Sequence, residues 1–77
     1  MEDRIREVMA GALKIDINLI GDSFSMAGSS EWDSLRHMDL VAAVEQYIGG
    51  ELTFEEIVKM TSYSGVCEVV RRHTRAE

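Results

Sequence analysis

Apolar residues recur at helical spacing along most of the chain. Residues 2 to 14 carry an apolar stripe with charged residues on the other side, which predicts an amphipathic helix. Residues 34 to 48 are apolar around more than half of the helical circumference, so we expect this second helix to lie centrally and to touch the others. Either Ser62 or Ser64 can cap a last helix. Its stripe consists of Tyr63, Val66, Val69, Val70 and His73.

Turn and capping residues separate these stretches. The pair Gly49-Gly50 can adopt the left-handed conformation that closes a helix. Thr53 and Glu56 form a capping-box pattern, which predicts a short third helix ending near Met60. Residues 16 to 31 are rich in glycine, serine, aspartate and asparagine, which indicates a long loop. We expect five apolar residues to hold this loop on the core: Ile17, Leu19, Ile20, Phe24 and Met26.

These elements predict an all-α fold, a four-helix bundle with three longer helices, a short third helix and a long loop between helices 1 and 2. No strand-like alternation of useful length occurs, and Gly65 is a local weakness in the last helix. The 77 residues form a single domain, 1–77. A chain this short buries only about 60% of its unfolded surface. We therefore expect a module on which other proteins act rather than an enzyme.

The charge of the chain is negative and unevenly distributed. The formal net charge is −6, and residues 15–62 hold nine acidic residues against Arg36 and Lys59. Because phosphate-backbone binders display clustered lysine and arginine, nucleic acid is a poor partner. A one-signed surface of this kind steers partners with basic surfaces, although it can also serve solubility alone.

One cysteine cannot form an internal disulfide, and no stretch has the length of a membrane span or the pattern of a signal peptide. We therefore expect a cytoplasmic protein that does not insert into membranes. Cys67 is interpreted as a half-buried packing residue rather than a nucleophile. His37 lacks companions at metal-binding spacing, so no metal site is predicted.

The tripeptide Asp33-Ser34-Leu35 places a hydroxyl at the start of the second helix. A serine nucleophile needs an adjacent base, for which only His37 and His73 are candidates, and the chain has no G-x-S-x-G elbow. A hydrolase is therefore improbable, and no catalytic residue is assigned. Read alone, Asp33 and Ser34 also fit simple helix caps.

The segment Glu31-Trp32-Asp33-Ser34-Leu35, with the order and spacing of the helices after it, resembles the prosthetic-group site of acyl carrier proteins. The resemblance spans almost the whole chain. It implies that Ser34 receives 4′-phosphopantetheine from coenzyme A, with a separate phosphopantetheinyl transferase supplying the base and magnesium. The thiol of the arm would then carry acyl or aminoacyl thioesters between loading and transfer enzymes with basic docking surfaces.

The resemblance also assigns roles to other residues. Asp33 would engage the transferase, and Leu35 would make an apolar contact with partner enzymes. Acidic contacts would come from Asp39, Glu45, Glu55 and Glu56. Among these, Glu45 lies at a helical angle that also suits an internal hydrogen bond. An acyl-chain groove would be lined by residues for which ordinary core packing is the default alternative: Met26, Val44, Leu52, Ile57, Met60 and Val66.

The chain departs from housekeeping fatty-acid carriers around the serine, with Ser30-Glu31-Trp32 before the motif and Arg36-His37 after it. This favours a specialised carrier of secondary metabolism, envelope lipid synthesis or aminoacyl transfer. Trp32 fits a hydrophobic anchor folded back on the bundle, or a recognition residue, or both. We expect a monomer. The alternative is an acidic helical interaction module that is never modified.

Overall fold

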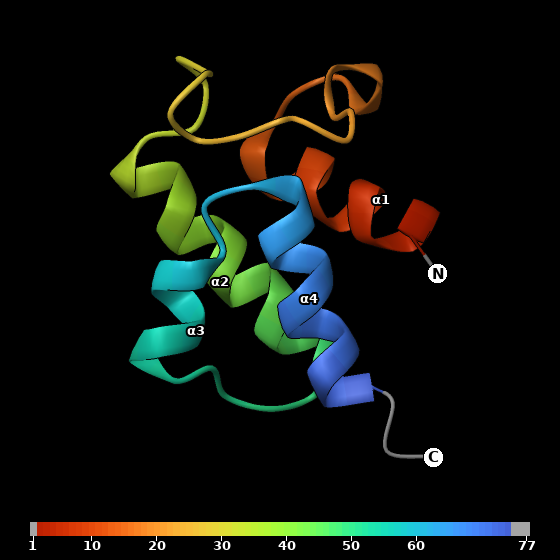
Figure 1. Ribbon diagram of the computed structural model, residues 1–77, viewed down its shortest axis with the longest axis vertical. Coiled ribbons are helices and arrows are strands. Elements are labelled where there is room, and N and C mark those ends of the chain that lie inside the picture. The colour runs from red at the N-terminus through yellow and green to blue at the C-terminus, as the bar shows by residue number, and fades with distance from the viewer. Residues whose placement is uncertain (1, 75–77) are drawn as a thin grey trace.

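The computed structural model describes residues 2–74, with side chains from residue 4 onward. This part of the chain forms four α-helices and one 3₁₀ turn, which confirms the predicted all-α bundle (Figure 1). The elements are α1 (Glu2–Leu13), η1 (Ile17–Leu19), α2 (Ser34–Ile48), α3 (Phe54–Lys59) and α4 (Tyr63–Thr74).

Both long helices before α3 end in the same kind of turn. Lys14 has a positive φ of 59°, and the amide of Ile15 donates to the carbonyl of Ala10 at 3.1 Å. Gly49 has a φ of 73°, and the amide of the next glycine donates to the carbonyl of Glu45 at 3.2 Å. These are the bonds of the Schellman motif. The first helix therefore ends one residue before the predicted position, because Lys14 takes the left-handed conformation.

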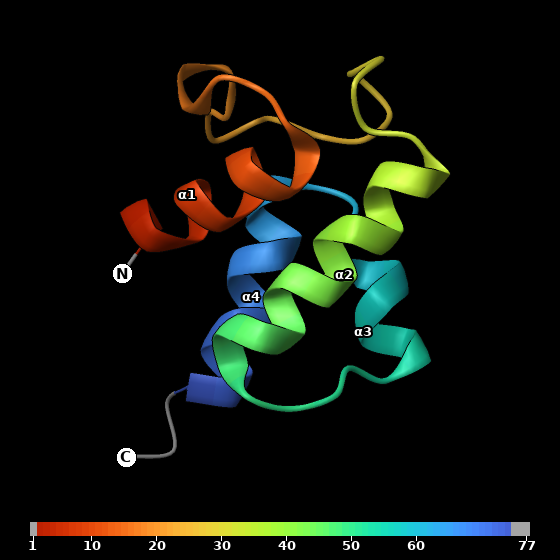
Figure 2. The ribbon, with the colours of Figure 1, turned by 180° about the vertical axis from the view of Figure 1, so that it is seen from behind.

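The central helix is α2, which packs against both α1 and α4, while α3 contacts α4 (Figures 1 and 2). The faces that meet are the apolar stripes of the sequence, as ridge-and-groove packing of amphipathic helices requires. The most deeply buried aliphatic side chains of this core are Ile5, Met9, Leu13, Leu40, Val44, Met60, Val66, Val69 and Val70. Cys67 is also buried, with 3% exposure, so the expectation that it is half-buried is wrong.

The loop between α1 and α2 is held at fewer points than predicted. Ile20 is buried and both Phe24 and Met26 pack against the core, as expected. Ile17 and Leu19 instead lie on the 3₁₀ turn with their side chains exposed, Leu19 by 56%. The loop is also bonded to the α3–α4 connection, since the amide of Met26 donates to a carbonyl there at 2.9 Å. Backbone hydrogen bonds replace part of the expected apolar anchoring.

Gly65 is a requirement of the packing rather than a local weakness, so the sequence-based interpretation is wrong. It is buried at the start of α4, where a β-carbon would lie 2.3 Å from the carbonyl oxygen of Lys59. Ser62 caps this helix by accepting a hydrogen bond from the Gly65 amide at 3.0 Å. Only glycine lets the end of α3 approach the start of α4 this closely.

Candidate functional site

Ser34 is the first residue of α2, and its side chain is exposed. The preceding Asp33 caps the helix, with its carboxylate accepting the amide of Arg36 at 2.9 Å. Among the described residues, the Ser34 hydroxyl takes part in no internal hydrogen bond. The capping role therefore belongs to Asp33, and the hydroxyl of Ser34 is open to solvent.

Both histidines are engaged in hydrogen bonds with residues other than Ser34. The indole Nε1–H of Trp32 donates to Nδ1 of His37 at 3.1 Å, so this nitrogen is an acceptor. The other nitrogen, Nε2, then carries the proton and donates to the carbonyl of Ile57 on α3 at 2.9 Å. His73 lies on α4 and is bonded to a glutamate. Ser34 thus lacks the activated arrangement that nucleophilic catalysis requires.

Trp32 anchors the end of the long loop directly before the serine. Its ring is 2% exposed and stacks on Phe24, with 5.5 Å between ring centroids. Burial of an indole is tolerated when its N–H has a partner, which His37 supplies. The predicted anchoring role is confirmed, and the chain enters α2 from a fixed point.

Large apolar side chains are exposed on α2 and on α3. Leu35 is 79% exposed and Met38 lies one turn further along α2. On α3, Phe54 is 78% exposed and Val58 lies one turn after it. Of these four side chains, the sequence analysis named only Leu35 as a partner contact. We call these four side chains the apolar docking face.

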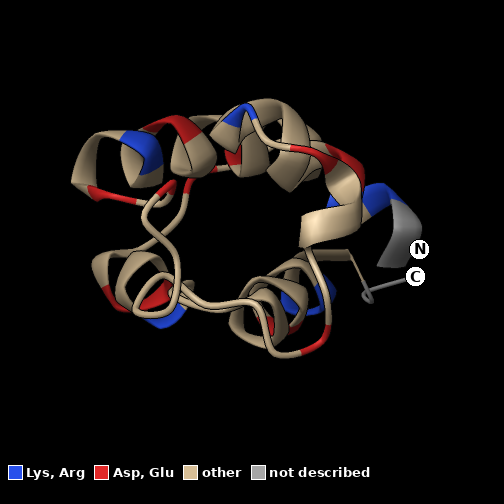
Figure 3. Ribbon diagram, turned by 90° about the horizontal axis from the view of Figure 1, so that it is seen from above, with Lys and Arg blue, Asp and Glu red and all other residues tan. Residues whose placement is uncertain are grey.

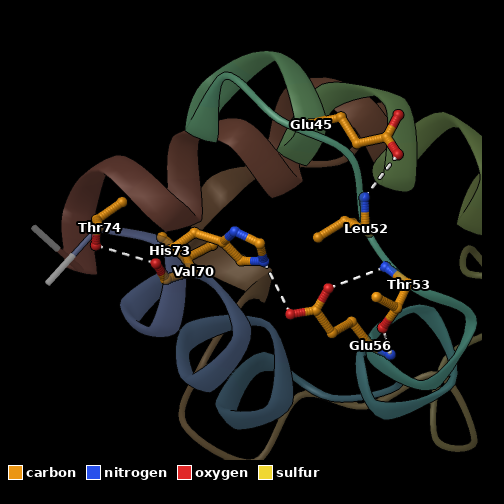
Figure 4. A network of polar contacts seen from close by, with 7 residues as sticks. All are labelled: Glu45, Leu52, Thr53, Glu56, Val70, His73 and Thr74. Atoms are coloured by element: carbon orange, nitrogen blue, oxygen red, sulfur yellow. Dashed lines mark hydrogen bonds and ion pairs between the residues drawn. The ribbon is translucent and has the colours of Figure 1, made fainter. Parts of the chain in front are cut away.

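The acidic residues of the predicted partner surface differ in how free they are. Asp39 lies 3.6 Å from Arg36, in an exposed pair. Glu45 accepts the amide of Leu52 at 3.0 Å, so the internal hydrogen bond considered for it is present (Figure 4). Glu55 is exposed and has no partner among the described residues. Most of the expected acidic contacts are therefore already engaged within the chain.

Glu56 caps the start of α3 and links this helix to α4. One carboxylate oxygen accepts the amide of Thr53 at 2.9 Å and completes the predicted capping box, while the other lies 2.8 Å from Nε2 of His73 on α4 (Figure 4). The Thr53 backbone bond is the main cause that lowers the pKa of Glu56, and His73 lowers it further. This carboxylate is held ionised by the fold.

Charges of both signs occur around the bundle (Figure 3). Two exposed ion pairs connect separate elements: Arg6 and Asp22 lie 3.1 Å apart, and Lys59 and Glu68 lie 3.0 Å apart. Each exposed pair of this kind contributes little stability. Arg6, from outside residues 15–62, thus pairs with one acid of that segment, whereas Lys59 pairs with an acid outside it.

The six residues predicted to line an acyl groove belong to the core or pack against it. Val44, Met60 and Val66 are fully buried, and Leu52 is buried at the edge. Met26 and Ile57 are half-buried beside them. Because protein interiors are close-packed, a chain entering here would have to displace these side chains.

The described residues contain no cluster of histidine, cysteine, aspartate and glutamate that could hold a metal ion. Over the same residues, no helix has the length and apolar character needed to cross a bilayer.

Comparison with known families identifies the chain's family. Residues 3–70 match the family described as the phosphopantetheine attachment site, PP-binding. The matched region extends from α1 through most of α4 and includes the exposed serine at the start of α2. No curated protein matches the chain.

Proposed function

Because the chain belongs to the phosphopantetheine-attachment carriers of the acyl carrier protein family, we propose that Ser34 is the residue that bears its 4′-phosphopantetheine. The observation that carries this proposal is the exposed Ser34 hydroxyl, which has no internal hydrogen bond in the described part of the chain. A hydroxyl engaged in capping would first have to be released. Here Asp33 performs the capping instead.

The surroundings of Ser34 fit a phosphodiester. The serine lies at the N-terminus of a helix of 15 residues, where the helix dipole favours negative charge. The serine is exposed, so the hydroxyl can accept an arm without the core having to open. When bound, the group supplies a terminal thiol on which cargo is held as a thioester.

The chain contributes the acceptor atom and leaves activation to the transferase. In the attachment step, Oγ of Ser34 forms a bond to the β-phosphorus of coenzyme A while the pyrophosphate bond breaks. The adenosine bisphosphate half leaves, and the serine proton passes to a base of the transferase. This division of labour agrees with the engagement of both nitrogens of His37 in other hydrogen bonds.

We assign partner recognition to the apolar docking face together with Asp33, Asp39 and Glu55. All four side chains of the apolar docking face are more than half exposed. A group of exposed apolar side chains often marks an interaction site, whereas single ones are common on any protein surface. Partners with an apolar recess and a basic rim would match this surface. Acyl and aminoacyl groups remain the proposed cargo, and the six groove residues the proposed lining for an acyl chain.

The proposed setting of this exchange is the cytoplasm, in a specialised rather than a housekeeping pathway. The free thiol of Cys67 is compatible with a reducing compartment. The departures around the serine, above all the buried Trp32, support a distinct partner set.

The proposal is tested by intact mass after incubation with coenzyme A and a transferase of broad specificity. Wild type should gain the mass of the arm, Ser34→Ala should gain nothing, and Ser30→Ala should behave as wild type. Ser30 is a matched control because it is also exposed and lies four residues before Ser34. Modification of Ser34→Ala, or none of wild type, would refute the assignment. The second outcome would favour the alternative of an unmodified interaction module.

A further inference from the structure

His37 connects the loop end before Ser34 to α3, two segments that are not adjacent in the sequence. Its Nδ1 accepts the indole N–H of Trp32, the residue two positions before Ser34. Its Nε2–H donates to the carbonyl of Ile57 in α3, 20 positions away in the sequence. Only a neutral imidazole protonated at Nε2 can make both bonds at once.

The helix at the far end of this link, α3, is the shortest α-helix in the described part of the chain. α3 has six residues, none of them buried, and a helix of this length is marginal without tertiary contacts. Its final carbonyls lack partners within the helix. The carbonyl of Ile57 receives only a long bond of 3.3 Å from the amide of Met60, and His37 supplies the shorter one of 2.9 Å.

The link also joins the two halves of the apolar docking face. Leu35 and Met38 belong to α2, whereas Phe54 and Val58 belong to α3. An enzyme that reads both helices while acting on Ser34 needs them in one fixed arrangement. If α3 moves independently, ordering this helix costs free energy during binding and lowers the affinity.

We infer that His37 is a positioning residue for the modification of Ser34: it holds α3 in register with the helix start that presents the serine. The inference rests on the proposed function. Loosening the link should raise the KM of the transferase for this carrier. The kcat should stay unchanged, because Asp33 and the start of α2 are untouched.

Two variants of His37 distinguish its hydrogen bond with Trp32 from its hydrogen bond with Ile57. In His37→Asn the amide oxygen can still accept from Trp32, but the side chain is too short to reach Ile57. In His37→Gln the longer amide can donate to Ile57 in place of Nε2. We expect KM to rise about fivefold in His37→Asn, because the loss of one hydrogen bond changes an affinity by about this factor. In His37→Gln, KM should return most of the way to the wild-type value.

The unmodified protein gives independent readouts by NMR. Wild type should show the Nε2–H tautomer of His37 and a slowly exchanging indole proton on Trp32. Amide exchange in α3 should quicken in His37→Asn and stay near wild type in His37→Gln. A Nδ1–H tautomer, or equal exchange in all three proteins, would overturn the inference.

A stability control excludes a merely structural effect. Ile5→Val removes a methylene from the α1 core, which is distant in sequence from α3, and should leave KM unchanged. The inference is overturned if Ile5→Val raises KM as much as His37→Asn at similar loss of stability. It is also overturned if His37→Asn matches wild type in KM. Failure of wild type to accept the arm at all would instead refute the proposed function, and the inference with it.

Discussion

At the residue scale, Gly65 shows how one side chain can decide whether two helices join. The carbonyl of Lys59 ends α3 and lies where a β-carbon on Gly65 would stand. Since that neighbour is backbone rather than a flexible side chain, it cannot move aside without displacing the turn. The start of α4 can therefore pack against the end of α3 only because Gly65 has no side chain.

Gly65→Ala should therefore lower the free energy of unfolding by about 2–3 kcal/mol. The matched control is Gly11→Ala, at an exposed position of α1 where an added β-carbon meets nothing within 4 Å. That change should stabilise the protein by about 0.5–1 kcal/mol through helix propensity. Urea unfolding followed by circular dichroism measures both. Similar effects of the two substitutions would show that the close approach to Lys59 is not limiting.

At the scale of the element, α3 depends on polar bonds at both of its ends. Thr53 and Glu56 form the capping box at its start, and Glu56 extends the connection to His73 on α4. His37 bonds to the carbonyl of Ile57 near its end. No side chain of α3 is fully buried, so these polar contacts hold the helix together with the half-buried Ile57.

Glu56→Gln should lower the free energy of unfolding at neutral pH by about 1 kcal/mol, because charge-assisted bonds become neutral ones. The pKa of Glu56 is lowered below its ordinary value of 4.5. Its stabilising contribution is therefore complete above pH 4.5 and is lost as the pH falls through the lower folded value. Urea unfolding of both proteins at neutral pH and at about pH 3 should show the difference shrinking on acidification. A difference independent of pH would contradict this account.

How well the sequence predicts these features depends on how local their causes are. The left-handed Gly49, the Asp33 cap and the capping box of Thr53 with Glu56 each involve neighbours within a few positions, and all are present. The partner of Glu56, His73, lies 17 positions away. Residue patterns within one helix carry no information about such a partner. The exposure of Ile17 and Leu19, and the need for Gly65, likewise follow from how separate segments meet.

At the scale of the whole molecule, the fold buries the apolar core and leaves Ser34 and the apolar docking face exposed. Helical periodicity predicted the bundle, but it overestimated how much of α2 is covered. Met38 belongs to the apolar part of the pattern and is nevertheless exposed. Periodicity identifies a position as apolar, but it does not show whether a neighbouring helix covers that position.

Partner recognition should depend more on apolar contact than on charge. Phe54→Ala should raise the KM of the transferase about tenfold, since buried aromatic residues dominate interface energies. Glu55→Gln, the adjacent exposed position, should change it by about twofold or less, because rim charges contribute little. Steady-state kinetics at two salt concentrations would test both. A larger effect of Glu55→Gln, abolished by salt, would show that electrostatic steering dominates instead.

The central claim is that the attachment point is the hydroxyl of Ser34 and no other. The direct measurement is fragmentation mass spectrometry of the protein after treatment with coenzyme A and the transferase, with the added group localised to one residue. The neighbouring Ser29 and Ser30 lie in the same stretch of chain and serve as internal alternatives. The account predicts the arm on Ser34 alone. Localisation to either neighbouring serine, or to any other residue, would contradict it.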